Sequence, residues 1–361
     1  MQWSSFFKDN LKPVMAYQPG LRQEQIQQMV QADTIYKLSS NESPLPPYPA
    51  ALAAMQKSLS LLNEYPEGSC YRLTQQLADH FNIPAQQIVI GNGSNELIDL
   101  IATTCLTPGD NVVYCWPSFV VYRSCAQIAG ADHRELALAP NASFDLDALL
   151  AAIDDKTKIV FVCTPNNPTG AVVKRTDFER FLSQVPAHVL VVVDAAYEEF
   201  VDDEQAVRPL DYFDGQRPYV VLHTFSKAYA LAGMRCGYGF VPAVLADMLH
   251  KVREPFNVNT LSQVAAEASF GDQEELWRRV ELNAKGRQQL QQCFAQLGLK
   301  APVSQGNFVW VEVPDAAATF EELQRRGIIV RPFAGANGLR VGVGDPQGVA
   351  ATITAFTEIF G

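Results

Sequence analysis

The fold of this chain is set by two apolar stretches, KIVFVC at residues 158–163 and VLVVV at residues 189–193. Neither stretch alternates apolar with polar residues, so each is expected to form a strand that is covered on both faces. A helical pattern over residues 176–184 lies between them. Strands and helices that alternate in this way build a mainly parallel sheet between layers of helices. The sequence therefore predicts an α/β fold.

The same alternation continues on both sides of these stretches. Further strands are expected over residues 87–90, 111–115 and 219–222, and further helices over 49–61, 71–82, 94–106 and 118–129. After residue 270 the pattern changes to a long helix, a half-buried alternating strand, short strands and further helices, which are expected over 273–297, 307–313, 317–326, 328–331 and 338–343 and at the end of the chain. This second pattern is typical of a smaller α+β domain.

We therefore expect three segments. Residues 1–48 would form an N-terminal arm and part of the small domain, residues 49–256 the large domain, and residues 257–361 the rest of the small domain. A helix within residues 245–270 is expected to bridge the two domains. A length of 361 residues leaves room for about two domains.

Composition excludes several classes of protein. Apolar residues make up 48% of the chain, and 28 basic against 39 acidic residues give a net charge of −11, which disfavours binding to nucleic acids and anionic membranes. No apolar run approaches the roughly 18 residues that span a bilayer, and the first residues lack the pattern of a signal peptide. The seven scattered cysteines contain no C-x-x-C pair, so we expect reduced thiols in a cytoplasmic protein and no metal site.

Polar side chains follow two of the predicted strands at their carboxyl ends, where α/β proteins bind ligands. The sequence Thr224-Phe225-Ser226-Lys227 places two hydroxyls and an amine after the strand at 219–222, and Arg235 follows eight residues later. A buried lysine at such an edge acts as a nucleophile, because desolvation lowers its pKa. The hydroxyls and the guanidinium of Arg235 are suited to a phosphate.

Other residues at the predicted strand ends could bind further chemical groups of one ligand. Asp194 ends a strand and requires a cationic partner if it is buried, and Tyr197 lies one turn further on. Asn167 lies in a proline-bracketed turn, and Gly93 and Ser94 open a helix whose free amides bind anions. A phosphate, a pyridinium nitrogen, a phenolate oxygen and an amine-reactive carbonyl would satisfy this set. Pyridoxal 5′-phosphate (PLP) carries all four.

The lysine segment SKAYALAGMRCGY at residues 226–238 resembles the lysine motif of fold-type-I PLP-dependent aminotransferases. The order of the other motifs is also similar, from Gly-Ser through Asn-Pro-Thr-Gly and Asp-x-x-Tyr to Ser-Lys and Arg. The resemblance implies the fold-type-I architecture, with a large PLP-binding domain. It implies that Lys227 forms the aldimine with the cofactor and moves the substrate proton, and that Asp194 keeps the pyridine nitrogen protonated.

The resemblance also implies the remaining contacts. The cofactor contacts are Tyr197 and Asn167 at the phenolate oxygen, Phe119 stacked on the ring, Gly93, Ser94, Thr224, Ser226 and Arg235 at the phosphate, and Tyr65 reaching the phosphate of the neighbouring subunit. Asn41 and Arg340 are implied on the substrate side, with Arg340 as the clamp for a carboxylate. A shared active site of this kind implies a homodimer that takes a small amino donor and a 2-oxo acid acceptor.

Within the fold type, the chain is similar to the histidinol-phosphate aminotransferase branch, which exchanges an amino group between glutamate and imidazole-acetol phosphate. The stretches at residues 17–20, 40–44, 256–259 and 329–332 carry this similarity. It implies that Arg331 and Arg340 bind the substrate phosphate together with Tyr17 of the partner subunit. The short loop before Arg340 is also similar to an aromatic aminotransferase branch, while threonine-phosphate decarboxylases fit less well.

Without the family, the competing hypothesis is a nicotinamide-dependent dehydrogenase. The Gly91-Asn92-Gly93 loop opens a helix as in a dinucleotide fingerprint, but Glu96 replaces the third glycine. The pairing of Asp194 with Lys227 also argues against that class.

Overall fold

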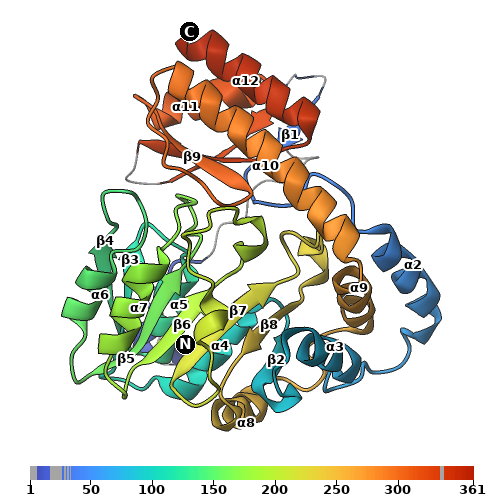
Figure 1. Cartoon of the computed structure of the whole chain (residues 1–361), viewed down its shortest axis with the longest axis vertical. Helices are drawn as coiled ribbons and strands as arrows, with labels where there is room; N and C mark the ends of the chain where they lie inside the picture. The colour runs from blue at the N-terminus through green and yellow to red at the C-terminus, as the bar shows by residue number, and fades with distance from the viewer. Residues whose placement is uncertain (1–5, 17–26, 28–29, 31, 33, 334–336) are drawn as a thin grey trace.

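The computed structural model describes residues 6–16, 27, 30, 32, 34–333 and 337–361. Within these residues the chain forms two main hydrophobic clusters, a large one and a small one, each around its own sheet, and a third, minor one around Val30 and Ile329. In the view of Figure 1 the smaller unit lies above the larger one. None of the helices in these ranges is long and apolar enough to cross a bilayer.

The large unit is built on a seven-stranded sheet in the order β2-β8-β7-β6-β5-β3-β4. Its strands are β2 (Ile88–Gly91), β3 (Asn111–Trp116), β4 (Asp132–Ala137), β5 (Thr157–Cys163), β6 (Leu190–Asp194), β7 (Tyr219–Thr224) and β8 (Gly237–Phe240). β8 runs antiparallel to both of its neighbours, β2 and β7, and all the other pairs in this sheet are parallel. The expected α/β fold with a mainly parallel sheet is therefore confirmed.

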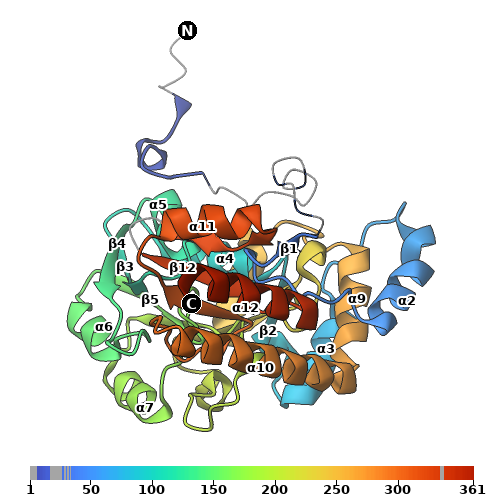
Figure 2. The same cartoon turned by 90° about the horizontal axis from the view of Figure 1, so that it is seen from above.

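Helices cover both faces of this sheet. They are α2 (Pro49–Ser58), α3 (Tyr71–Phe81), α4 (Ser94–Cys105), α5 (Val121–Ala129), α6 (Leu146–Ala152), α7 (Arg175–Gln184), α8 (Ala243–Val252) and α9 (Thr260–Phe270). Figure 2 shows α4 and α5 on one side of the strands, with α6 and α7 on the other. Strands that are covered in this way lose contact with water on both faces, which explains why their sequences do not alternate.

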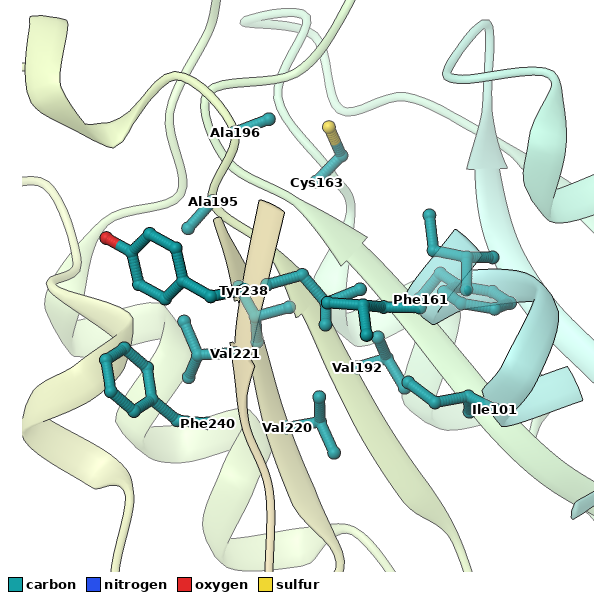
Figure 3. Close-up of a cluster of buried hydrophobic side chains, with 14 of the residues drawn as sticks. Ile101, Phe161, Cys163, Val192, Ala195, Ala196, Val220, Val221, Tyr238 and Phe240 are labelled. Atoms are coloured by element: carbon teal, nitrogen blue, oxygen red, sulfur yellow. The ribbon is translucent and has the colours of Figure 1, made fainter. Parts of the chain in front are cut away.

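The core of the large unit lies between the central strands and α4. Figure 3 shows Phe161 of β5 and Val192 of β6 near Ile101 of α4, and Val220 of β7 lies in register with Val192. All four side chains are fully buried. Each stabilises the fold by roughly 1.5–3 kcal/mol relative to an exposed position. This rigid centre fixes the ends of β6 and β7.

The small unit combines the end of the chain with a short piece of the N-terminal arm. Its sheet has the order β11-β12-β9, with β9 (Phe308–Glu312), β11 (Arg331–Pro332) and β12 (Gly338–Gly342). A second pair joins β1 (Tyr36–Lys37) to β10 (Ile328–Ile329), so the arm contributes a strand. The helices of this unit are α11 (Ala316–Arg325), α12 (Pro346–Phe360) and the C-terminal part of α10 (Gln273–Gln296).

The expected bridging helix over 245–270 is wrong, because the structure divides it into α8 and α9. Pro255 interrupts the pattern, Phe256 adopts a left-handed φ of 59°, and the Asn259 side chain caps α9 by accepting from the Ser262 amide. The helix that joins the two units is α10, which runs between them in Figure 1. Its Leu276 belongs to the large cluster, whereas Phe294 belongs to the small one.

The sequence-based domain boundaries remain a prediction. The large hydrophobic cluster continues past residue 256 and includes Val258, Ala265 and Phe270. Leu38 of the arm is a member of the small cluster.

Candidate active site

Neighbouring parallel strands bring Asp194 and Lys227 to the same edge of the large sheet. Asp194 is the last residue of β6, where it lies in register with Cys163 of β5 and Leu222 of β7. Lys227 follows three residues after the end of β7. The carboxyl ends of such strands form the crevice in which α/β proteins bind ligands.

Asp194 is a buried carboxyl group with two hydrogen-bond donors. Its Oδ2 accepts from the Tyr122 hydroxyl at 2.7 Å and its Oδ1 from the Ala196 amide at 3.1 Å. Burial raises the pKa of this carboxyl, while the two hydrogen bonds and the charge of Lys227 oppose the rise. A carboxylate held in this way is well placed to bind a protonated ring nitrogen.

Lys227 is half-buried. Burial lowers the pKa of Lys227 to about 8, the charges of Arg340 and Arg235 lower it further, and Glu42 and Asp194 oppose this effect. Its Nζ donates to the Ser40 carbonyl at 3.3 Å. A lysine with such a pKa has a substantial neutral fraction near pH 8, which is the form that attacks a carbonyl.

An anion cradle lies at the start of α4, built from glycines and Arg235. Gly93 has a φ of +87°, and a Cβ at this position would lie 2.6 Å from Arg235 Nη2, so the guanidinium lies directly against the helix start. Arg235 Nη1 donates to Ser226 Oγ at 3.1 Å, and the Ser226 amide donates to Thr224 Oγ1 at 3.1 Å. A Cβ at Gly237 would lie 2.4 Å from the Ser94 nitrogen. Helix-start amides with an arginine and hydroxyls match a phosphate.

Glu96 supports the loop that precedes this helix. Its Oε2 accepts from the Asn92 amide at 2.5 Å and from Asn257 Nδ2 at 2.6 Å. A dinucleotide fingerprint has a glycine at this position for close packing of the helix on the strand, so the presence of Glu96 argues against the dehydrogenase hypothesis.

A second group of side chains faces the site from the arm and the small unit. Asn41, which is 2% exposed and has a φ of 53°, donates through Nδ2 to the Tyr197 hydroxyl at 3.0 Å. Arg340 is 8% exposed and donates through Nη1 to Asn167 Oδ1 at 2.6 Å and through Nη2 to the Ser39 carbonyl. The structure thus links the predicted substrate-side residues to the predicted cofactor-side residues.

Arg331 and Arg340 lie opposite each other on β11 and β12. Directly paired residues of antiparallel strands project from the same face of the sheet. Trp310 of β9 is the partner of Arg340 on its other side. The Arg340 Cζ lies 5.7 Å from the ring centroids of both Phe308 and Phe333. Two cationic side chains therefore share one face with aromatic rings around them.

Three predicted residues remain, and of these Phe119 contacts the hydrogen-bond partner of Asp194. Phe119 is half-buried and meets the ring of Tyr122 edge-on at 5.8 Å. Tyr65 is 83% exposed and stacks on Phe256 at 4.8 Å. Tyr17 lies outside the described residues.

Sequence reasoning missed several residues of the site. The partner of Asp194, Tyr122, lies inside a predicted helix, and no motif singled it out. Phe308 and Phe333 also flank Arg340. Each lies two residues from a strand partner of Arg340, Phe308 from Trp310 and Phe333 from Arg331, so their proximity to Arg340 follows only once the strand register is known.

The residues present fit PLP. The cradle of Gly93, Ser94 and Arg235 would hold its phosphate, Asp194 would bind the ring nitrogen, and Lys227 would react with its carbonyl. The hydroxyl of Tyr197, which accepts from Asn41 Nδ2, and the side chain of Asn167, which accepts from Arg340 Nη1, would bind the phenolate oxygen.

Comparisons with known proteins agree with this fit. The aminotransferase class I and II family matches residues 33–356. Histidinol-phosphate aminotransferase 2 of Pseudomonas fluorescens is 43% identical over 95% of this chain and 94% of its own length. An aromatic amino acid aminotransferase of Streptomyces avermitilis is 40% identical over 86% of this chain and 87% of its own.

A solved structure extends the likeness to the fold and the cofactor. The crystal structure of histidinol-phosphate aminotransferase from Sinorhizobium meliloti in complex with PLP has a TM-score of 0.88 and 25% identity, covering 99% of this chain and 98% of that one. The lysine, the strand-end aspartate and the phosphate cradle are the chemistry that PLP requires for amine transfer. The chain belongs to the aminotransferase class I and II family and is a PLP-dependent transaminase of fold type I.

Proposed function

We propose that this enzyme exchanges the amino group between glutamate and imidazole-acetol phosphate, forming histidinol phosphate and 2-oxoglutarate in histidine biosynthesis. The observation that carries the proposal is the register of Arg331 opposite Arg340, which gives two guanidinium groups on one face of the small sheet. A phosphate monoester carries a charge of about −1.5 to −2 at neutral pH. Two arginines balance this charge better than one arginine does. A carboxylate carries a single negative charge, so one arginine is enough to bind it. Relatives named histidinol-phosphate aminotransferase, about 40% identical over most of the chain, support the same substrate.

The residues of the large unit would perform the transfer itself. Bound PLP supplies an electron sink that stabilises negative charge at the substrate Cα. Asp194 would hold the proton on the ring nitrogen, and Tyr197 and Asn167 would donate to the phenolate oxygen. The amine of Lys227 would carry the proton from the substrate Cα, and its lowered pKa supports both the acceptance and the return of that proton.

Arg340 would serve both substrates. Its guanidinium already donates to Asn167 Oδ1, so a bound carboxylate or phosphate would be linked to the cofactor side of the site through one side chain. Arg331 would add its charge only when the larger phosphate is bound. Tyr17 of the partner subunit would complete the phosphate site.

We further propose that the active unit is a homodimer in the cytoplasm. The exposed ring of Tyr65 is available to reach the cofactor phosphate of a neighbouring subunit. All seven cysteines are free thiols in the structure, which supports a reducing compartment.

An aromatic aminotransferase is the second candidate. The rings of Phe308 and Phe333 near Arg340, with Trp310 beside them, would favour an aromatic donor with a carboxylate at Arg340. The Streptomyces relative supports this alternative.

Arg331→Gln tests the phosphate pair. Removing one charge-assisted contact costs about 1.5–3 kcal/mol, so the KM for histidinol phosphate should rise about 10- to 100-fold, while the KM for glutamate should change by less than about threefold. Arg325→Gln is the matched control, since Arg325 is an exposed arginine on α11 of the same unit. Equal effects of Arg331→Gln on both substrates, or no effect on either, would contradict the assignment of the phosphate site.

A further inference from the structure

The hydroxyl of Tyr48 reaches the segment that carries Lys227. Tyr48 is fully buried, and its hydroxyl donates to the carbonyl oxygen of Ala228 at 2.9 Å. Ala228 directly follows Lys227, whereas Tyr48 precedes α2 and lies 180 residues earlier in the chain. We infer that Tyr48 is a positioning residue, which holds the Lys227 segment in the orientation that proton transfer requires.

The backbone after Lys227 needs such an anchor. Ala230 has a φ of 56°, a left-handed conformation that is strained for an L-residue. Two hydrogen bonds close the turn, from the Ala230 amide to the Lys227 carbonyl and from the Leu231 amide to the Phe225 carbonyl, both at 3.0 Å. A strained turn of this kind persists only where the surroundings hold it. The Tyr48 hydroxyl binds it from outside the turn.

A small cavity borders the same segment. Its volume is about 30 Å³, and Lys227, Ala228, Arg279, Asn283 and Asn307 are among its lining residues. A cavity of this size accommodates about one or two water molecules. The side of Lys227 that faces the cavity is therefore less tightly packed than a core side chain. For this reason the position of the Lys227 side chain depends on the anchoring of its backbone more strongly than the position of a core side chain does.

Tyr48 is itself held by a cation from α10. The Arg279 Cζ lies 4.3 Å from the centroid of the Tyr48 ring, and Arg279 Nη1 donates to the Pro46 carbonyl at 2.7 Å. Glu275 fixes Arg279 through a 2.7 Å bond to its Nε. Arg279 is 7% exposed, so these interactions are shielded from water. Because α10 also packs in the small unit, it links that unit to the Lys227 segment.

The Tyr48 hydroxyl acts as a donor and not as an acid or base. Burial raises the pKa of Tyr48 well above its ordinary value, although the nearby Arg279 opposes this. The hydroxyl therefore keeps its proton at every pH at which the enzyme works. Its role is to hold the Ala228 carbonyl, and the reacting proton remains with Lys227.

Tyr48→Phe removes only this hydroxyl. On the holoenzyme, single-turnover reaction with glutamate should become about tenfold slower, with the glutamate Kd within twofold of wild type. The kinetic isotope effect with glutamate deuterated at Cα should increase, because proton transfer becomes more fully rate-limiting. The proposal rests on transamination and not on the identity of the native donor, so the same factor is expected with phenylalanine.

Tyr219→Phe is the matched control. Tyr219 is also fully buried and donates to a backbone carbonyl, that of Pro209, at 2.7 Å, but it lies at the opposite end of β7. Its loss should lower the melting temperature by a similar amount and leave the single-turnover rate within twofold of wild type. Arg279→Lys is an independent second variant, since it keeps the hydroxyl and the charge but loses the planar contact with the ring. It should slow the reaction to a smaller extent than Tyr48→Phe.

A rate and isotope effect in Tyr48→Phe equal to those of Tyr219→Phe would overturn the inference, as would an unchanged rate in Arg279→Lys. A slower reaction with glutamate alone, without the same factor for phenylalanine, would also contradict a role at Lys227. These outcomes do not depend on whether histidinol phosphate is the native donor.

Discussion

At the scale of single residues, the chemistry depends on two groups whose proton affinity is set by burial. Lys227 and Asp194 lie at the ends of adjacent strands, and each is displaced from its ordinary pKa, the amine downward and the carboxyl upward. The neutral forms of both are therefore more accessible than in water. Binding of a cation at Asp194 would reverse the shift at that carboxyl, since an adjacent positive charge favours the carboxylate.

The pH dependence of cofactor attachment follows from Lys227. The neutral amine is the nucleophile, so the rate at which the apoenzyme links PLP to Lys227 should rise as the pH passes about 8. Arg340→Gln removes a charge that lowers this pKa, and the midpoint should move to higher pH. Stopped-flow absorbance between pH 6 and 10 measures both midpoints, with Arg325→Gln as the surface control. A midpoint in Arg340→Gln that stays in place or moves to lower pH would refute this coupling.

Asp194→Asn should leave the fold largely intact and remove most of the activity. The amide oxygen can still accept from the Ala196 amide, and the Tyr122 hydroxyl can turn to accept from the new NH2 group. The neutral amide, however, cannot balance a protonated ring nitrogen. The barrier should rise by several kcal/mol, which corresponds to a loss of more than about 100-fold in kcat. Tyr122→Phe keeps the carboxylate and serves as a control, with a smaller expected loss. An Asp194→Asn enzyme within about tenfold of wild type would rule out this role.

Residue identities at the site were largely predictable, because motifs at strand ends carry them. The motifs single out Lys227, Asp194, Arg235 and Gly93, and the structure places these residues at or close after the ends of β6 and β7 and at the start of α4. Tyr122 and Tyr48 were not identified. Each acts through a contact with a residue 72 or 180 positions away, and no local pattern records such a distance.

At the scale of elements, the buried parallel strands were predictable and the strands with weaker patterns were not. The prediction missed β4, which has polar residues and a largely half-exposed burial pattern at the edge of the sheet. It also missed β8, which has two glycines among four residues, a composition that disfavours strands. Gly237 is required there because a Cβ would lie 2.4 Å from the Ser94 nitrogen. The functional need for a close backbone contact thus overrides the strand propensity.

The short helical turn η5 (Glu198–Phe200), which follows Tyr197, carries a carboxyl group whose protonation should affect stability. Burial raises the pKa of Glu199 to about 8 from an ordinary 4.5, and its Oε2 has no hydrogen-bond partner among the described residues. Between these pH values the folded protein keeps a proton that the unfolded chain releases. The folded state should therefore lose stability as the pH rises, by roughly 1 kcal/mol per pH unit.

Glu199→Gln removes this titration. The variant should gain stability relative to wild type as the pH is raised from 5 to 8, as measured by urea unfolding at several pH values. Glu204→Gln, which changes an exposed carboxyl in the following segment, should leave the pH profile unchanged. A constant difference between Glu199→Gln and wild type across this range would show that Glu199 does not titrate in this way.

At the scale of the whole molecule, the two main hydrophobic clusters are joined by α10, and the candidate active site contains residues of both units. Arg340 lies in the small unit, and its guanidinium donates to Asn167 of the large unit and to Ser39 of the arm. The overall α/β architecture was predicted from the strand pattern. The role of α10 as the connection was not, because its sequence shows only a long polar-faced helix.

The proposed homodimer predicts complementation between two damaged subunits. Lys227→Ala and Tyr65→Ala should each be inactive at limiting PLP, since one lacks the amine and the other the contribution to its neighbour's phosphate site. After subunit exchange in an equal mixture, half of the dimers contain one intact site, so about a quarter of the wild-type activity should return. Activity that stays at the average of the two variants would mean that each subunit builds its site alone.

The most direct test of the proposed substrate is the first half-reaction of the purified holoenzyme. Histidinol phosphate and phenylalanine would be mixed with it separately at equal concentration, and the loss of the absorbance of lysine-linked cofactor would be followed in a single turnover. We expect histidinol phosphate to react at least about 100-fold faster, in proportion to the extra charge-assisted contacts at Arg331 and Arg340. A faster reaction with phenylalanine would contradict the proposal and assign Arg340 to a carboxylate alone.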